Sequence, residues 1–370
     1  MLYKKGFRRG GLLVFVIFAL ILSGCANTTT TNKIASQKKE RITTPKVTSQ
    51  TPTSPIQVSY QRGIDILLYG NYPDIKGLTE NLFTQLKSIG VNSIAINFPF
   101  YMDNLYSSNV YTGKSTPTDL ELQQILSIAH GFGFSTNLRP ILDQKNLRGG
   151  GDGWRGIIHP QNVATWFGAY TNMIVHYATL LQSVKGSILT IGAELNSMEQ
   201  YTEYWDTLIQ KVRSVFSGEI TYSSNWWPQL ISSNVQFWKQ LNFISTDLFV
   251  PVQGPNVSNM VSSWNPYLSA LQQAYTQYNM PIVVTELGAA SQEGSYSRPW
   301  VSSSTGIYSS SSQADYFEAA FTALHSLSFV KGVYIWDVPF NQLLPGYNPS
   351  TDTGFNPLGK EAENIIQKNF

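Results

Sequence analysis

Short apolar runs alternate with helix-patterned segments along most of this chain. Eight runs have the length and character of buried strands, and they occupy residues 63–70, 91–98, 134–142, 188–194, 220–225, 243–250, 281–286 and 330–337. Other segments space their apolar residues as amphipathic helices do, near residues 78–89, 119–130, 164–181, 202–216, 260–278, 313–327 and 359–367. Strands that helices connect must run parallel, and parallel strands are buried on both faces. The alternation therefore requires a parallel sheet that helices cover.

Eight parallel strands with helical connections are typical of a closed barrel. We therefore predict an α/β fold, a single (β/α)8 TIM barrel over residues 57–370, with a signal peptide and a disordered linker before it. Thr118 and Glu121 form a capping box at one helix start, and Gly218 suits a helix end. The alternative is an open doubly wound sheet, which would have fewer strands and usually a glycine-rich phosphate loop after the first. The segment 69–77 (YGNYPDIKG) is not such a loop.

The first residues have the pattern of a secretory signal. A basic segment, 4–9, precedes an apolar run, 12–22, that is too short for a comfortable membrane-spanning helix. Residues 22–25 (LSGC) resemble the bacterial lipobox, which implies cleavage before Cys25 and attachment of lipid, including palmitate, to it. We expect a signal peptide over 1–24 and a lipid anchor that holds the protein on the extracytoplasmic side of the bacterial cell envelope. The alternative is an uncleaved N-terminal anchor.

The segment that follows the predicted signal has little capacity to fold. Residues 25–56 are rich in Thr, Ser, Lys, Gln and Pro and poor in large apolar side chains, so they bury too little surface to form a core. We expect a solvated tether between the lipid and the barrel. The net charge of the chain is +2, which argues against nucleic acid as a partner because phosphate binding needs clustered Lys and Arg. We expect a monomer.

Two strand-like runs end in a glutamate. Glu194 follows the run 188–193, and Glu286 follows 281–285. Burying a carboxylate costs free energy unless it is paired or its pKa shifts. In a barrel of this kind the reacting groups lie at the carboxyl ends of the strands, so both glutamates would face one mouth. Two carboxylates there commonly serve glycoside hydrolysis, and the alternative for either one alone is a structural ion pair.

The glutamate pair resembles that of the retaining glycoside hydrolases of clan A, with the acid/base after strand four and the nucleophile after strand seven. Further stretches resemble family 113, whose known members are mainly β-1,4-mannanases. They are GWRGIIHP (153–160), ILTIGAELNSME (188–199), ITYSSNWW (220–227), MPIVVTELG (280–288), GVYIWD (332–337) and FNPLGKEAE (355–363). The resemblance extends from about residue 60 to 367.

This resemblance implies a double displacement on a β-1,4-linked mannan or a related β-glycan, either a polysaccharide or an oligosaccharide. Glu194 would be the general acid/base and Glu286 the nucleophile. In a retaining pair the two carboxyl groups lie about 5 to 5.5 Å apart, whereas an inverting pair needs about 6.5 to 9.5 Å to admit a water.

Other residues near the expected mouth are candidates for binding sugar, and they are Arg139, Trp154, Arg155, Asn225, Trp226 and Trp336. Trp336 resembles the platform beneath the sugar at the cleavage point. Arg139, at the end of strand three, would hold Glu286 or a substrate oxygen, or else pair with Asp143 or another acid. Trp154 would stack on sugar or pin its own loop.

Two positions differ from the clan A pattern. Ala193 stands where many of these enzymes have an Asn that contacts the sugar 2-hydroxyl, and Phe249 stands where many have a Tyr that hydrogen-bonds the nucleophile. These differences favour one alternative, a non-catalytic sugar-binding lipoprotein on the same barrel. The pair of glutamates favours an enzyme, because a binding protein has no need of two opposed carboxylates.

The chain lacks the sequence motifs of other classes of hydrolase. The four histidines, His130, His159, His176 and His325, do not have the spacing of a metal site. No G-x-S-x-G elbow for a serine nucleophile is present. We therefore expect no metal and no cofactor.

Overall fold

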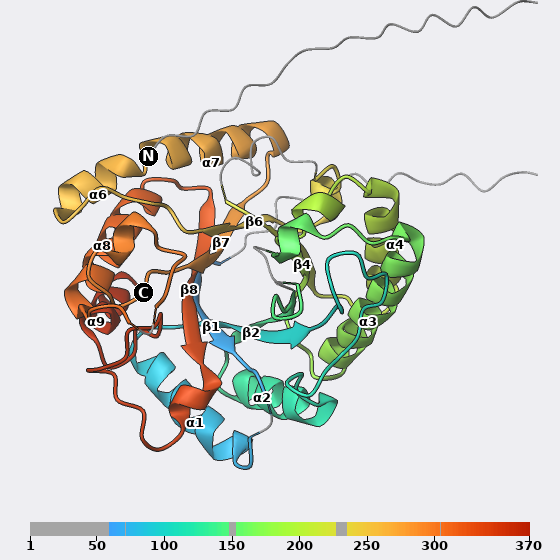
Figure 1. Cartoon of the computed structure of the whole chain (residues 1–370), viewed down its shortest axis with the longest axis horizontal. Helices are drawn as coiled ribbons and strands as arrows, with labels where there is room; N and C mark the ends of the chain where they lie inside the picture. The colour runs from blue at the N-terminus through green and yellow to red at the C-terminus, as the bar shows by residue number, and fades with distance from the viewer. Residues whose placement is uncertain (1–58, 71, 148–152, 227–234, 304) are drawn as a thin grey trace, which may run out of the picture. The chain divides into compact units, whose positions relative to one another are not determined.

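The computed structural model describes residues 59–70, 72–147, 153–226, 235–303 and 305–370 (Figure 1). The predicted signal peptide (1–24), Cys25 and the whole tether to residue 56 lie outside these residues. The segment Ile56–Phe370 forms one compact unit. Among the described residues, no helix has the length and hydropathy needed to cross a membrane.

The core of the unit is a closed barrel of eight parallel strands, paired in chain order (Figure 1). The strands are β1 (Gln61–Leu67), β2 (Ser93–Phe100), β3 (Ser135–Leu142), β4 (Ile188–Ala193), β5 (Glu219–Ser224), β6 (Ile244–Leu248), β7 (Ile282–Leu287) and β8 (Val330–Pro339). β8 pairs with β1, which closes the sheet. The predicted (β/α)8 barrel is confirmed, and the open doubly wound sheet is wrong.

Helices surround the barrel (Figure 1). They are α1 (Ile75–Ser88), α2 (Asp119–Gly131), α3 (Val163–Ser183), α4 (Thr202–Arg213), α6 (Val257–Ser263), α7 (Asn265–Tyr278), α8 (Ser310–Leu324) and α9 (Glu361–Asn369). Short 3-10 turns are η1 (Arg155–Ile157), η2 (Asn196–Met198), η3 (Trp238–Gln240), η4 (Ser295–Ser297) and η5 (Phe340–Leu343). The capping box of Thr118 and Glu121 is present at the start of α2.

The expected helix over 260–278 is divided into α6 and α7. Pro266 lies in the first turn of α7, where a proline is tolerated because the first helical N–H groups have no partner within the helix. Inside a continuous helix the same proline would remove a hydrogen bond and clash with the preceding turn. The chain therefore ends one helix at Ser263 and begins another at Asn265.

Most of the core is apolar, but the barrel interior near the mouth is not. Four tryptophans that stand outside the strands are fully buried: Trp166, Trp205, Trp238 and Trp264. Within the strands, however, Asp65, Asn97, Arg139 and Asp247 are also fully buried. Arg139 lies inside β3, which continues to Leu142, so its predicted position at the end of the strand is wrong. The inward position places its guanidinium among the buried acids.

The packing at the start of β1 can be tested with one substitution. The Tyr334 hydroxyl donates a hydrogen bond to Gln61 Oε1 at 2.7 Å, which holds the ring against Gly63. A Cβ at Gly63 would lie 2.3 Å from a carbon of that ring. We expect Gly63→Ala to lower the free energy of unfolding by about 1–3 kcal/mol, the usual cost of overpacking a core. Urea denaturation followed by circular dichroism measures it.

The matched control is Gly168→Ala on the exposed side of α3, where an added Cβ has no heavy atom within 4 Å. Ala should stabilise that helix by about 1 kcal/mol. Equal stability of the two variants would contradict the packing of Tyr334 against Gly63.

Candidate active site

One cavity at the barrel mouth contains both predicted glutamates. Its volume is about 560 Å³. The residues that line it are Gln144, Trp154, Arg155, Glu194, Asn196, Asn225, Trp226, Phe249, Glu286, Trp300, Trp336 and Phe355. Every residue that the sequence predicted for the site is in this set except Arg139, which lies beneath the cavity and contacts Glu286 from within the barrel.

Glu194 follows β4 directly and has an unusual backbone. Its φ angle is 51°, in the left-handed region, which costs an ordinary residue about 1–2 kcal/mol. The pairing of β4 with β5 shifts register between Thr190 and Ala193, and the Glu194 N–H donates to Ser223 O at 2.8 Å. A register shift at a barrel rim re-aims a side chain, and here it brings the Glu194 carboxylate into the cavity.

A buried hydrogen-bond chain secures this turn from behind. The Leu195 N–H donates to the Tyr222 hydroxyl at 2.9 Å, and the Tyr222 hydroxyl donates to Glu199 Oε1 at 3.0 Å. Glu199 is almost fully buried, and burial raises the pKa of its carboxyl to about 7, while the Tyr222 hydrogen bond opposes that rise. The sequence reasoning missed both residues. They hold the backbone next to Glu194 without entering the cavity.

The carboxyl of Glu194 has one neutral and one distant charged partner. Asn225, the residue after β5, donates from Nδ2 to Glu194 Oε1 at 2.8 Å. The Arg155 guanidinium lies 3.9 Å from Glu194 Oε2. Burial raises the pKa of Glu194 to about 7, and Arg155 partly offsets this. The group therefore titrates close to neutral pH.

Glu286 has a close cationic partner in Arg139. It is the penultimate residue of β7, and its Oε1 accepts a hydrogen bond from Arg139 NH2 at 3.0 Å. Arg139 also contacts Asp65 at 3.1 Å and Asp247 at 3.3 Å. The prediction that Arg139 holds Glu286 is confirmed. The alternative is a pairing with Asp143 or another acid. Asp143 is not a partner, because the arginine points into the barrel, but two other acids, Asp65 and Asp247, are.

The charges around Glu286 oppose one another. Burial raises its pKa, the Asp247 carboxylate raises it further, and the Arg139 guanidinium lowers it. The Glu194 charge also raises it, so the two glutamates interact electrostatically. A guanidinium hydrogen bond favours the ionised carboxylate. Arg139 therefore opposes the net rise in the pKa of Glu286, and Glu194 has no such hydrogen bond.

Aromatic side chains form much of the cavity wall. Trp336 lies in β8 and is partly exposed. Trp154 covers Gly156, where a Cβ would lie 2.2 Å from its ring, so this tryptophan both pins its own loop and faces the cavity. Trp226 stacks on Trp300 with ring centroids 5.8 Å apart. Trp300, which is 46% exposed, was not predicted from the sequence.

The two positions that differ from the clan A pattern lie at this mouth. Phe249 lines the cavity and packs edge-on against Phe355, with centroids 6.3 Å apart. It has no hydroxyl to offer Glu286, which instead has the hydrogen bond from Arg139. Ala193 is buried at the end of β4. Among the described residues, no three His, Cys, Asp or Glu side chains are placed to hold a metal ion.

Solved structures with the same barrel were found by comparison. The β-mannanase AaManA from Alicyclobacillus acidocaldarius shares 24% identity, with a TM-score of 0.74 over 85% of this chain and 98% of that one. A second β-1,4-mannanase structure gives 23% identity and the same TM-score over 84% and 98%. The β-glucuronidase of Ruminococcus gnavus gives 12% identity and a TM-score of 0.57 over 84% and 50%. These likenesses show a common fold.

A search of curated proteins found no match to this chain. The family model of Glycoside Hydrolase Family 113 matches residues 71–360, which is most of the barrel. The match includes β2 to β8, both mouth glutamates and Arg139. The chain therefore belongs to glycoside hydrolase family 113 and is a glycoside hydrolase.

Proposed function

We propose that this chain is a retaining glycoside hydrolase that cleaves β-1,4-linked mannan or a related β-glycan by double displacement. Glu286 is the nucleophile, and Glu194 is the general acid/base. The hydrogen bond of 3.0 Å from Arg139 to Glu286 carries this assignment. It favours an ionised carboxylate on β7, opposite a Glu194 carboxyl whose pKa is raised to about 7 by burial.

In the first step, the Glu286 carboxylate attacks the anomeric carbon while Glu194 gives its proton to the departing glycosidic oxygen. The product is a glycosyl ester on Glu286, with the leaving sugar released as an alcohol. In the second step, Glu194 takes a proton from water, the resulting hydroxide oxygen bonds to the anomeric carbon, and Glu286 leaves as a carboxylate. Esterification removes the Glu286 charge, so the pKa of Glu194 falls between the steps as its role requires.

The lining of the cavity suits a neutral glycan. The platform assigned to the sugar at the cleavage point is Trp336, and Arg155 and Asn225 face the same space with polar groups. The tryptophans Trp154 and Trp226 supply flat apolar surface for further sugar units, which favours attack within a chain. The mannan assignment is supported by two of the similar solved structures, which are β-mannanases.

A non-catalytic sugar-binding role has less support. Ala193 and Phe249 remove two side chains that many clan A enzymes use. A binding protein would gain nothing from burying two carboxylates beside its ligand, because each costs free energy to desolvate. Glu286 accepts a hydrogen bond from the charged Arg139, whereas Glu194 accepts one from the neutral amide of Asn225. Acid/base chemistry needs two carboxyl groups in such different surroundings.

We also propose that Cys25 carries a lipid that holds the protein on the extracytoplasmic side of the bacterial envelope. The lipobox-like sequence LSGC (22–25) and the basic segment before it support this. Cys25 is the only cysteine in the chain, which leaves no other site for thioether attachment.

Azide tests the nucleophile. Glu286→Ala should abolish turnover of an aryl β-mannooligosaccharide, because no group remains to attack the anomeric carbon. Added azide should restore part of the activity by attacking in place of the missing carboxylate, and the product should be the α-mannosyl azide, with inverted configuration. Nuclear magnetic resonance of the product measures the configuration.

The matched control for azide is Glu293→Ala. Glu293 is an exposed glutamate six residues after the end of β7. It should keep full activity and show no response to azide. Undiminished turnover in Glu286→Ala would rule out Glu286 as the nucleophile.

The pH dependence tests the acid/base. Glu194 must be protonated for the first step, so kcat/KM should fall as pH rises through its pKa of about 7. The Arg155 guanidinium lowers that pKa. Arg155→Met should therefore raise it and move the alkaline limb of the kcat/KM profile to higher pH.

The control for this shift is Arg62→Met, since Arg62 lies at the opposite end of the barrel strands and bonds to Gly90 O. Its profile should overlay that of the parent chain. In Arg155→Met the alkaline limb could instead stay in place or move to lower pH. Either result would show that the pKa of Glu194 does not determine this limb.

Lipid attachment has a direct test. The parent chain, expressed in bacteria with an alkyne-tagged fatty acid, should incorporate the tag, and Cys25→Ala should not. In-gel fluorescence after click labelling measures the incorporation. Ser23→Ala, which changes a neighbouring residue and keeps the thiol, serves as the control. Label that persists in Cys25→Ala would refute the anchor.

A further inference from the structure

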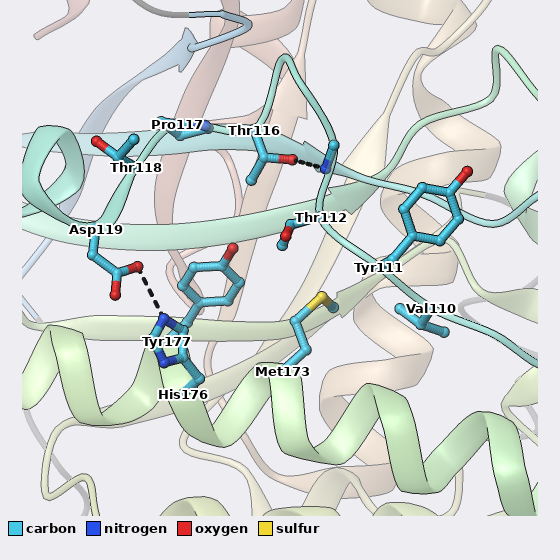
Figure 2. Close-up of a pocket in the computed structure, with 11 residues that line it drawn as sticks. Val110, Tyr111, Thr112, Thr116, Pro117, Thr118, Asp119, Met173, His176 and Tyr177 are labelled. Carbon is cyan, nitrogen blue, oxygen red and sulfur yellow. Dashed lines mark hydrogen bonds and ion pairs between the residues drawn. The ribbon is translucent and has the colours of Figure 1, made fainter.

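A second cavity lies between the β2–α2 connection and α3 (Figure 2). Its volume is about 570 Å³, close to that of the cavity at the barrel mouth. One wall comes from residues 110–119, and the other from Met173, His176 and Tyr177 on α3. No residue proposed for catalysis lines this cavity, so the proposed reaction leaves it unexplained.

Hydrogen bonds hold the connection in a fixed shape. The Thr116 hydroxyl donates to Pro99 O at 2.7 Å and accepts the Gly113 N–H at 2.9 Å. Tyr101 and Tyr111 exchange two backbone hydrogen bonds of 2.8 and 3.0 Å, and their rings stack with centroids 5.9 Å apart. The wall is therefore formed before any ligand arrives, which lowers the entropy cost of binding.

One polar group that faces the cavity has no hydrogen-bond partner among the described residues. Tyr177 is only 2% exposed, yet its hydroxyl makes no hydrogen bond with any residue that the structure describes. Figure 2 shows this hydroxyl directed away from α3, toward the connection that carries Thr112 and Thr116. Burial raises the pKa of Tyr177, so the hydroxyl keeps its proton and is free to donate it.

The cavity has little charge in its lining. His176 Nε2 lies 2.9 Å from Asp119 Oδ1, and this pair joins α3 to the start of α2. Asp119 is the only carboxylate in the lining, and the lining contains neither Lys nor Arg. A free anion would find no excess cation here, and a metal ion would find too few ligands. The cavity therefore suits a neutral molecule.

The rest of the lining mixes apolar surface with hydroxyls. Val110, Pro117 and Met173 are apolar, while Thr112 contributes a hydroxyl group. The Thr118 hydroxyl is bonded to Glu121 in the capping box of α2. Figure 2 shows the Tyr111 ring and the Asp119–His176 pair at opposite ends of the cavity. A sugar ring has an apolar face and a rim of hydroxyls, so a glycan matches this mixture of surfaces better than a purely apolar or a charged ligand would.

We propose that this cavity is a second glycan-binding site, which holds a short length of the same neutral β-glycan that the active site cleaves. The inference rests on the proposed function for the identity of the glycan. The β2–α2 connection leaves the barrel at the carboxyl ends of the strands, as the connections that carry Glu194 and Arg155 do. Glycan presented to this end of the barrel therefore meets both sites.

Calorimetry with an inactive chain tests the second site. The whole chain carrying Glu286→Gln, titrated with β-1,4-mannohexaose, should bind two molecules. Adding Thr112→Arg should leave one, because the long side chain would lie across the cavity toward Asp119. Thr207→Arg, at an exposed threonine of α4, is the matched control and should leave two. In the otherwise unchanged chain, Thr112→Arg should not alter hydrolysis of a short soluble substrate.

A smaller change separates ligand contact from folding. Tyr177→Phe removes the unpartnered hydroxyl and keeps the ring that packs edge-on against Phe98 at 4.8 Å. The Kd of the second site should rise roughly two- to tenfold, which is the usual effect of losing one hydrogen bond, and the first site should be unaffected. A single binding event in the Glu286→Gln chain, or two events that survive Thr112→Arg unchanged, would overturn the proposal.

Failure of this proposal is distinguishable from failure of the proposed function. A parent chain that leaves mannan intact and cleaves another β-glycan would reject the mannan assignment, and the same titration with that glycan would then test the cavity. A parent chain that cleaves mannan, together with a single binding event in the Glu286→Gln chain, would reject the second site alone.

Discussion

The Arg139 guanidinium inside the barrel is the interaction on which the candidate site depends. It is fully buried and lies within hydrogen-bond distance of Asp65, Asp247 and Glu286. One positive charge among three carboxyl groups cannot balance them all. Burial raises the pKa of each acid, and repulsion from Asp247 raises the pKa of Asp65 and Glu286 further. A buried ion pair of this kind contributes little to net stability, but removing one partner leaves a charge without compensation. Arg139 thus fixes the position and favours the charge of Glu286.

The two glutamates are held by different means, and this difference suits the two roles that we propose for them. Glu286 is part of a strand and has a cation directly beneath it. Glu194 lies in a left-handed turn after its strand, has an amide partner in Asn225, and is nearly 4 Å from Arg155. Two acids in one cavity whose surroundings push their protonation states apart are what paired acid/base and nucleophile chemistry requires. The Tyr222–Glu199 chain behind Leu195 keeps the turn in place.

The sequence predicted the barrel and the two glutamates at its mouth because both follow from repeated local patterns. Eight apolar runs specify the strands, and each glutamate stands where a strand ends. Asp65 and Asp247 were not predicted, because each is a single acid within an apolar run, and only closure of the barrel decides that it points inward. Trp300 and Phe355 lie in long connections without periodicity. The division between α6 and α7 was missed although Pro266 carried the signal, and the lipid anchor at Cys25 stays a prediction.

The central claim is that Glu286 forms a covalent bond to sugar while Glu194 handles the proton. The most direct measurement is trapping with a 2-deoxy-2-fluoro-β-mannobiosyl fluoride, whose fluorine at C2 slows both steps while its fluoride leaving group lets the first proceed. Mass spectrometry of the inactivated, digested protein should find one added disaccharide, on the peptide of β7 and on Glu286. An intact mass that does not change under conditions where mannan is cleaved, or an adduct on another residue, would contradict the mechanism.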